Sequence, residues 1–300
     1  MNILAAVQQA ISEIGLIAPP LLVGSSDLGT IQLLAIAQGS AASLAQEFDW
    51  QAMTKQYMFN LISYVGTGTT TVSSNVVILA AAPSPIPDTT YQVTGNGIPQ
   101  STYVVSCVGT TVTLSQPATI ANTTTLTFGK TKYAMPADYA RMINRTAYDK
   151  SRRWALAGPA TAQEWEWLQS SYISTGPRIR YRIFGGYIQT WPVIATNDLI
   201  SFEYMSNGYA IDAISGAAKT SFTADTDTYL WPDRLIQLCV KWRYLNQRGF
   251  DATSAFSEFQ MIYDIAKATD ASAATLSMGG TAGSVLINMN NIPDSGYGLS

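Results

Sequence analysis

The chain has 300 residues, of which 47% are hydrophobic and 12% are charged, with 17 basic and 20 acidic side chains. The net charge of −3 gives no global signal for binding nucleic acid or a membrane surface. The absence of histidine excludes Ser-His-Asp triads, Cys-His dyads and histidine-ligated metals, and it removes the usual general base of neutral-pH catalysis. Most enzyme classes are therefore disfavoured, and no cofactor is expected.

The two cysteines, Cys107 and Cys239, are too few for a disulfide framework or a four-cysteine zinc site. We expect both to be reduced and buried, since a free cysteine behaves as a small apolar residue. The first 23 residues lack a basic start and contain Glu13, so neither a signal peptide nor a membrane span is expected there.

Two helices are predicted at the start of the chain. The first covers residues 2–15 and cannot continue through the proline pair at Pro19. The second begins near Ser26 or Asp27 and runs to about Phe48. One face of the second helix, flanked by small residues, is expected to receive a neighbouring helix from the same chain or from an identical copy. This stripe consists of Ile31, Leu34, Ala35, Gln38, Ala42 and Ala45.

A change of composition predicts an all-β module over residues 63–129. Asp88 is the only charged residue in this stretch, which is rich in Thr, Val, Ser, Gly and Pro. Alternating residues such as Val112 and Leu114 are typical of half-buried strands, so five to seven strands are expected, with a disordered linker as the alternative. The β-branched runs are Thr70–Val72, Val76–Leu79, Tyr91–Thr94, Tyr103–Val108, Thr111–Leu114 and Thr124–Phe128.

The strands on either side of this module indicate how it is joined to the rest. Residues 54–62 form a predicted strand, and Thr131–Met135 is its expected partner. The module would then be an insertion between adjacent strands, with its two ends close together.

Later segments predict a hairpin and three further helices. Arg178–Phe184 and Tyr187–Trp191 flank a Gly-Gly turn, and Leu199–Met205 is expected as the third strand of the same sheet. The predicted helices cover residues 161–170, Pro232–Arg248 and Ala252–Ala268, the last capped by Asp251.

The acidic residues that stand close together have ordinary interpretations. Glu164 and Glu166 lie two positions apart on a predicted helix and so point to different sides. Asp225 and Asp227 lack the remaining ligands of a calcium loop and are expected to cap turns.

Basic side chains concentrate in residues 130–182, which carry ten basic and four acidic residues, whereas the flanking segments are net acidic. Three arginines share one face of a predicted strand and repel one another, so they require acidic partners or a bound anion. We expect contacts with another subunit, with passing DNA or solvent as alternatives. The residues concerned are Arg178, Arg180 and Arg182, together with Arg152 and Arg153.

Five segments carry a family resemblance: SLAQEFDWQAMTKQYMF, KYAMPADYARMINRTAYDKSRRW, GPATAQEWEWLQSS, TGPRIRYRIFGGYIQTWP and FTADTDTYLWPDRLIQLCVKWRYL. In this order they resemble the head–tail adaptor proteins of short-tailed phages, which are related in role to tail tubular protein A. The resemblance covers residues 1–62 and 130–300. The strings GNGIPQSTYVV and GTTVTLSQPAT in the remaining segment are similar to small β-modules of phage structural proteins.

The resemblance implies an α+β fold with three regions. Residues 1–62 and 130–270 would form a helical adaptor core with a small antiparallel sheet, and residues 63–129 an inserted all-β domain. Residues 271–300 would form a C-terminal arm that contacts the portal. The apolar residues expected to make that contact are Val285, Leu286, Ile287, Met289 and Ile292.

The resemblance also implies a structural role in the virion. The chain would form a ring with copies of itself, usually twelve, that joins the portal protein to the tail nozzle protein. Genomic DNA would pass through the ring without sequence specificity, and the β-insertion would face outward to hold tail fibres or spikes. The protein would be made in the host cytoplasm and reside in the neck of the phage.

Two other functions fit parts of the sequence. A glycan-binding tail module would use the aromatic content and the β-module, although none of the seven tryptophans lies within residues 63–129. A cell-wall hydrolase, an activity credited to some adaptors of this group, would need a facing carboxylate pair that the sequence does not indicate. We therefore expect a protein that is not an enzyme.

Overall fold

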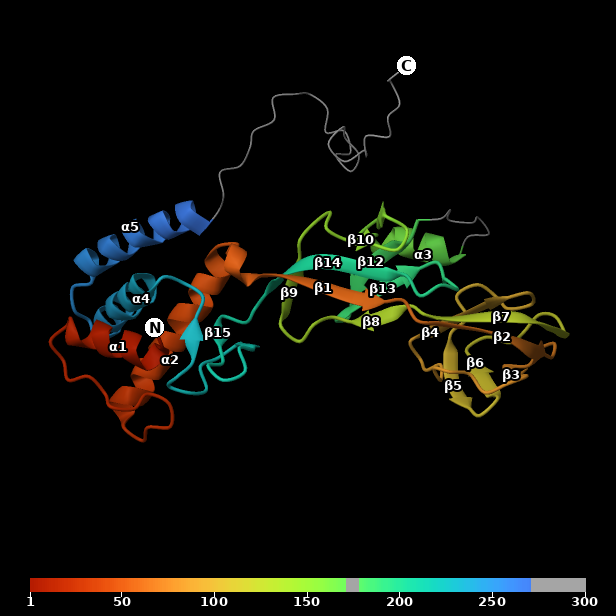
Figure 1. Cartoon of the computed structure of the whole chain (residues 1–300), viewed down its shortest axis with the longest axis horizontal. Helices are drawn as coiled ribbons and strands as arrows, with labels where there is room; N and C mark the ends of the chain where they lie inside the picture. The colour runs from red at the N-terminus through yellow and green to blue at the C-terminus, as the bar shows by residue number, and fades with distance from the viewer. Residues whose placement is uncertain (171–177, 271–300) are drawn as a thin grey trace, which may run out of the picture.

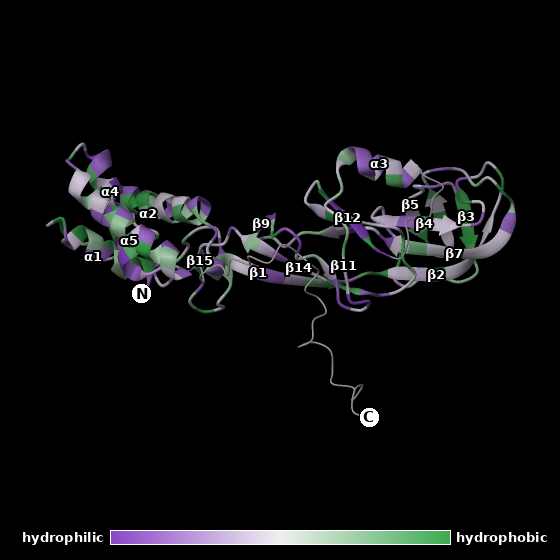
Figure 2. Cartoon of the chain, turned by 90° about the horizontal axis from the view of Figure 1, so that it is seen from above, coloured by the Kyte–Doolittle hydropathy of each residue, from purple (hydrophilic) through white to green (hydrophobic). Residues whose placement is uncertain are grey.

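The computed structural model describes residues 1–170 and 178–270 and shows an elongated α+β molecule (Figure 1). A body of helices forms one end, a six-stranded antiparallel sheet forms the other, and smaller sheets lie between them. The view from above shows the same linear order of parts (Figure 2). The α+β class expected from the sequence is confirmed for the described residues.

The helical body is built around α4, which packs against the other three helices of the body. The buried face of α4 includes Leu235, Leu238 and Cys239, as its apolar periodicity predicts. The predicted start of α2 near Asp27 is confirmed, and Asp27 caps the helix by accepting the amide of Thr30 at 2.9 Å. The helices are α1 (Ile3–Ser12), α2 (Leu28–Glu47), α4 (Asp233–Gln247) and α5 (Thr253–Asp270).

The face by which α2 packs is not the predicted one. Ile31 and Ala35 of the predicted stripe are exposed, and its other members are only partly buried. Because α2 is apolar almost all round, its periodicity does not select a face. Among the described helices, α2 is the one long and apolar enough to span a membrane, but core helices meet the same criterion. The buried face consists of Thr30, Leu33, Ile36, Ala37, Ser40, Ala41 and Leu44.

In the central sheets, two strand pairings differ from those predicted from the sequence. β1 (Thr54–Asn60) pairs along its whole length with β14 (Leu199–Ser206), not with residues 131–135. The hairpin of β12 (Arg180–Phe184) and β13 (Tyr187–Trp191) is confirmed, but its third strand is β8 (Lys132–Ala134). Both errors have one cause: alternation identifies a strand, whereas its partner depends on contacts distant in sequence.

Short elements complete the middle of the molecule. β14 also pairs with β9 and β10, while α3 covers one face of the hairpin by packing Trp165 and Leu168 against Trp191. These elements are β9 (Tyr139–Met142), β10 (Tyr148–Asp149), β11 (Trp154–Ala155), α3 (Ala162–Ser170), β15 (Ala210–Ile211), β16 (Ala218–Lys219) and β17 (Thr228–Tyr229), with a 3-10 turn at Gln51–Met53.

The six-stranded sheet has its own core, formed by one face that includes Val77, Val112 and Phe128. Its strands follow the order β4-β7-β2-β3-β6-β5. The two longest, β2 and β7, pair from Ser63 to Thr70, so the two ends of residues 63–129 lie side by side. The strands are β2 (Ser63–Thr70), β3 (Val76–Leu79), β4 (Tyr91–Gly95), β5 (Val104–Val108), β6 (Thr111–Leu114) and β7 (Asn122–Lys130).

Candidate interaction surfaces

The predicted arginine stripe is partly covered. Arg178 precedes β12 and is exposed, while Arg180 and Arg182 project from the face of β12 that α3 covers. The guanidinium of Arg182 lies 5.3 Å from the ring centroid of Trp165 and 4.6 Å from that of Phe184. Aromatic rings therefore accommodate the charge of Arg182 inside the chain.

Arg152 and Arg153, in the loop between β10 and β11, differ in their surroundings. Arg152 donates to Asp198 at 2.7 Å and to Thr196 at 3.0 Å. Arg153 is exposed and has a positive φ of 60°. Arg152 therefore has an acidic partner within its own chain, whereas Arg153 is available at the surface.

A second row of charge runs across the strands instead of along one strand. Arg182 of β12 lies opposite Gln189 of β13, and Gln189 lies opposite Lys132 of β8. Directly opposed residues project to the same face of a sheet, so two cations flank one amide. This row could not be predicted from the sequence, because it depends on the pairing of β8 with β13. The signal in the sequence is only that Lys132 precedes Tyr133 and that Gln189 follows Ile188, one polar and one apolar neighbour on each strand.

This row forms part of a cavity of about 290 Å³ at the junction with the six-stranded sheet. One wall comes from α3, through Trp165 and Glu166, and the opposite wall comes from β4 and Tyr103. Within the described residues, Arg182 Nε and Gln92 Oε1 are buried without hydrogen-bond partners. A site of this kind can bind a ligand that supplies both an acceptor and a donor.

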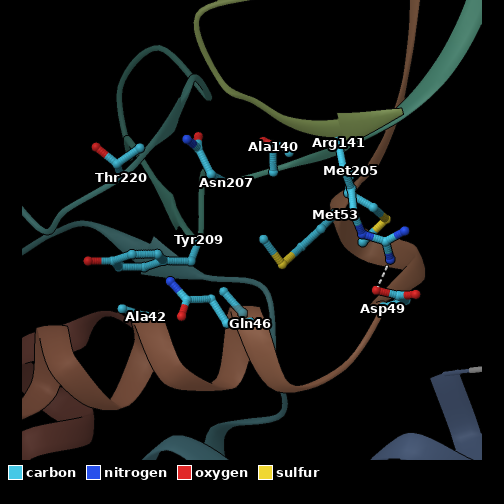
Figure 3. Close-up of a pocket in the computed structure, with 12 residues that line it drawn as sticks. Ala42, Gln46, Asp49, Met53, Ala140, Arg141, Met205, Asn207, Tyr209 and Thr220 are labelled. Carbon is cyan, nitrogen blue, oxygen red and sulfur yellow. Dashed lines mark ion pairs between the residues drawn. The ribbon is translucent and has the colours of Figure 1, made fainter. Parts of the chain in front are cut away.

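A larger crevice of about 470 Å³ separates the helical body from the central sheets. Figure 3 shows Ala42 and Gln46 of α2 along its lower side, with Tyr209 at one end and the Arg141–Asp49 ion pair at the other. Among the described lining residues, Asp49 alone carries a carboxylate, and this carboxylate is already paired with Arg141. This crevice therefore offers a contact surface but lacks the two carboxylates of a glycosidase.

Asp138 connects the strands next to this crevice. Its carboxylate accepts hydrogen bonds from Lys55 at 2.6 Å, Ser206 at 2.8 Å and Tyr204 at 2.9 Å. Burial opposes the charge, but these hydrogen bonds hold the pKa of Asp138 below its usual value. Burial and the hydrogen bond to the same carboxylate raise the pKa of Tyr204 to about 12. The cluster fixes β1, β14 and the segment before β9 relative to one another.

An apolar groove of about 580 Å³ lies at the free end of the helical body. Leu16, Leu21 and Ile17 form much of it, and Ile17 is 97% exposed. Leu28, at the start of α2 nearby in the chain, is 84% exposed. Exposed apolar patches of this kind mark protein contacts in soluble assemblies.

The carboxylates that stand close together in the sequence hold loops and a helix end. The prediction that Asp227 caps a turn is confirmed, whereas Asp225 binds a loop distant in sequence and Glu164 binds the start of its own helix. Glu164 accepts the amide of Thr161 at 2.9 Å, and these hydrogen bonds lower its pKa. Asp225 accepts the amide of Val23 at 2.7 Å, and Asp227 accepts that of Thr223 at 2.7 Å. In the described ranges, no group of three metal-ligating side chains is found.

The two cysteines are free: Cys239 is buried, while Cys107 is only partly buried. Burial raises the pKa of both thiols, which disfavours the reactive thiolate. The expected portal-contacting residues Val285, Leu286, Ile287, Met289 and Ile292 lie outside the described residues.

The three cavities and grooves described above lie at the junctions and at one end of an elongated α+β chain. Residues 110–279 match the SU10 adaptor protein family. The chain therefore belongs to this family of phage adaptor proteins and is a structural component of the virion. The match begins inside the six-stranded sheet and includes β6 and β7, so it extends into the region expected to lie outside the resemblance. Among curated proteins, none matches the chain.

Proposed function

We propose that this adaptor forms a closed ring, usually of twelve copies, that joins the portal to the tail nozzle around the path of the DNA. Its role would then be that of tail tubular protein A. The observation that carries the proposal is the placement of the helical body and the six-stranded sheet at opposite ends of an elongated chain that belongs to an adaptor family (Figure 1). Such a chain has separate surfaces for separate partners.

A ring requires two different, complementary surfaces on every chain, because each copy contacts the next head to tail. Residues 130–182 carry an excess of basic side chains, and residues 183–300 an excess of acidic ones. Arg178 and Arg153 are exposed and would provide basic contacts. Opposite charge on neighbouring copies would fix their register more than it would raise their affinity.

The proposal divides the chain into a core of residues 1–62 and 130–270, with residues 63–129 as an inserted domain. The separate apolar core of the six-stranded sheet supports this division, as does the pairing of β2 with β7. We further propose that the insertion faces outward and holds tail fibres or spikes, and that residues 271–300 contact the portal.

Electron microscopy of the purified chain, alone and mixed with the portal protein of the same phage, tests this function. Rings are expected at least when the portal is present. A chain that stays monomeric and does not bind portal would contradict the proposal. A zymogram on host cell walls is expected to show no clearing; clearing that is lost in Glu166→Gln would instead support a hydrolase.

A further inference from the structure

The 290 Å³ cavity at the junction with the six-stranded sheet is built from two distant parts of the chain. Arg182, Gln189 and Lys132 form a row on one sheet, and Trp165 and Glu166 of α3 stand beside that row. The rest of the lining comes from residues 89–92 together with Ser101 and Tyr103. The cavity therefore exists only when the six-stranded sheet is docked against the central part.

The orientation of Arg182 is fixed without using its hydrogen-bonding edge. Its guanidinium carbon lies over the rings of Trp165 and Phe184, 5.3 Å and 4.6 Å from their centroids. Stacking uses the flat face of a guanidinium, whereas the N–H groups lie in its plane. The Nε–H is buried and lacks an acceptor among the described residues. Arg182 is thus held as an oriented donor.

The opposite wall holds the complementary group. Gln92 Oε1 is buried and lacks a donor among the described residues. Gln92 forms a β-bridge with Tyr103, whose ring is about half exposed. The lining of this cavity therefore combines cationic side chains, the amide of Gln92 and aromatic rings.

We propose that the cavity binds one carboxylated sugar ring, such as a terminal uronic acid of a surface polysaccharide. Its carboxylate would accept from Arg182 and Lys132, and its hydroxyl groups would donate to Gln92 and Glu166. The less polar face of the ring would lie against Tyr103 or Phe184. The cavity is near the lower limit of ligand pockets, about 300 Å³, so it fits one ring rather than a chain of rings.

This inference goes beyond the adaptor role, since ring formation requires no glycan. It also differs from a glycan site confined to residues 63–129, because Arg182, Lys132 and Glu166 come from outside that segment. An acidic side chain of a partner protein carries the same charged group as a uronic acid, so a short glutamate peptide is included among the ligands tested.

Calorimetry on the full-length chain with glucuronic acid and galacturonic acid tests the proposal, with glucose as the ligand that lacks the carboxylate. At least one uronic acid is expected to bind saturably, and glucose at least tenfold more weakly. Lys132→Met and Gln92→Leu are each expected to weaken uronic acid binding at least tenfold. The matched control is Lys130→Met, because the ammonium of Lys130 lies 5.6 Å from the ring centroid of Tyr133 and does not line the cavity.

Circular dichroism checks that each variant is folded. Absence of saturable uronic acid binding would overturn the proposal, as would equal binding of glucose or unchanged binding by folded Lys132→Met. Stronger binding of a short glutamate peptide would assign the cavity to a protein partner and would also overturn it. Ring formation with portal is expected to persist in Lys132→Met, so a failure of the adaptor proposal is distinguishable from a failure of this one.

Discussion

The hydroxyl of Tyr133 accepts a hydrogen bond from the amide of Ile62 at 2.8 Å. The same hydroxyl donates to the carbonyl of Lys130 at 2.9 Å. One buried side chain therefore binds the chain both where it enters the six-stranded sheet and where it leaves. Burial raises the pKa of Tyr133, so the hydroxyl stays protonated and able to donate at neutral pH.

Replacing Tyr133 by phenylalanine removes this double contact and leaves the ring in place. The amide of Ile62 then lacks its acceptor, which is expected to lower the free energy of unfolding by about 1–3 kcal/mol. Urea unfolding measures the change, and faster hydrogen exchange at Ile62 locates it. The control is Tyr187→Phe, whose ring is 41% exposed. Equal effects of the two variants would show that the Tyr133 contact does not stabilise the junction.

Much of the secondary structure could be predicted from the sequence, but the pairing of strands could not. Alternation and turn residues predicted the β12–β13 hairpin, because its strands are adjacent in the chain. β1 pairs with β14, which lies about 140 residues further along, and nothing in the local pattern of β1 records that partner. Only Thr70, the last residue of β2, lies within a predicted strand, because Gly66 and Gly68 interrupt the apolar alternation of the rest.

The same limit explains what was missed in the candidate surfaces. The sequence predicted that Arg180 and Arg182 share a strand face, since residues two apart in a strand do so. It could not place Lys132 beside Gln189, because that neighbour relation comes from the β8–β13 pairing. Nor could it show that α3 covers the arginines, since Trp165 contacts Arg182 only in the folded chain.

The buried face of α2 offers a matched pair of substitutions. Ala41 is fully buried in the helical core, whereas Ala35 is exposed on the face that periodicity had predicted to be buried. Ala41→Leu is expected to overpack this core and lower the free energy of unfolding by about 1–3 kcal/mol. Ala35→Leu is expected to change it by less than about 0.5 kcal/mol. Thermal or urea unfolding of both variants shows which face packs. A larger loss of unfolding free energy in Ala35→Leu than in Ala41→Leu would contradict the structure.

Asp138 gives the stability of the chain a dependence on pH. Its pKa is lower in the folded chain than in the unfolded one, so its ionised form stabilises the fold above the unfolded pKa of about 3.9. This stabilisation is lost as the pH falls through the folded pKa.

Asp138→Asn is expected to lower the free energy of unfolding by about 1–3 kcal/mol at pH 7, because three hydrogen bonds lose their charged acceptor. The difference from the wild type is expected to shrink below about pH 4. Urea unfolding from pH 3 to pH 7 measures both effects, with exposed Asp264→Asn as the control. A difference that stays constant over this range would exclude the ionised form of Asp138 as its source.

The arginine stripe of Arg178, Arg180 and Arg182 tests how copies of the adaptor meet. The triple variant with serine at Arg178, Arg180 and Arg182 is expected to weaken ring assembly without unfolding the monomer, but Arg182 also stacks on Trp165. The double variant Arg178→Ser, Arg180→Ser leaves this stacking intact and tests the charges alone. If these charges meet acidic side chains of the next copy, added salt weakens wild-type assembly more than that of the variant, since exposed charges are screened. Microscopy and sedimentation at low and high salt measure this difference. Equal salt dependence of assembly in folded wild type and variant would show that the stripe does not face a neighbouring copy. DNA would then be the alternative partner, and DNA binding by the two proteins can be compared in the same salt series.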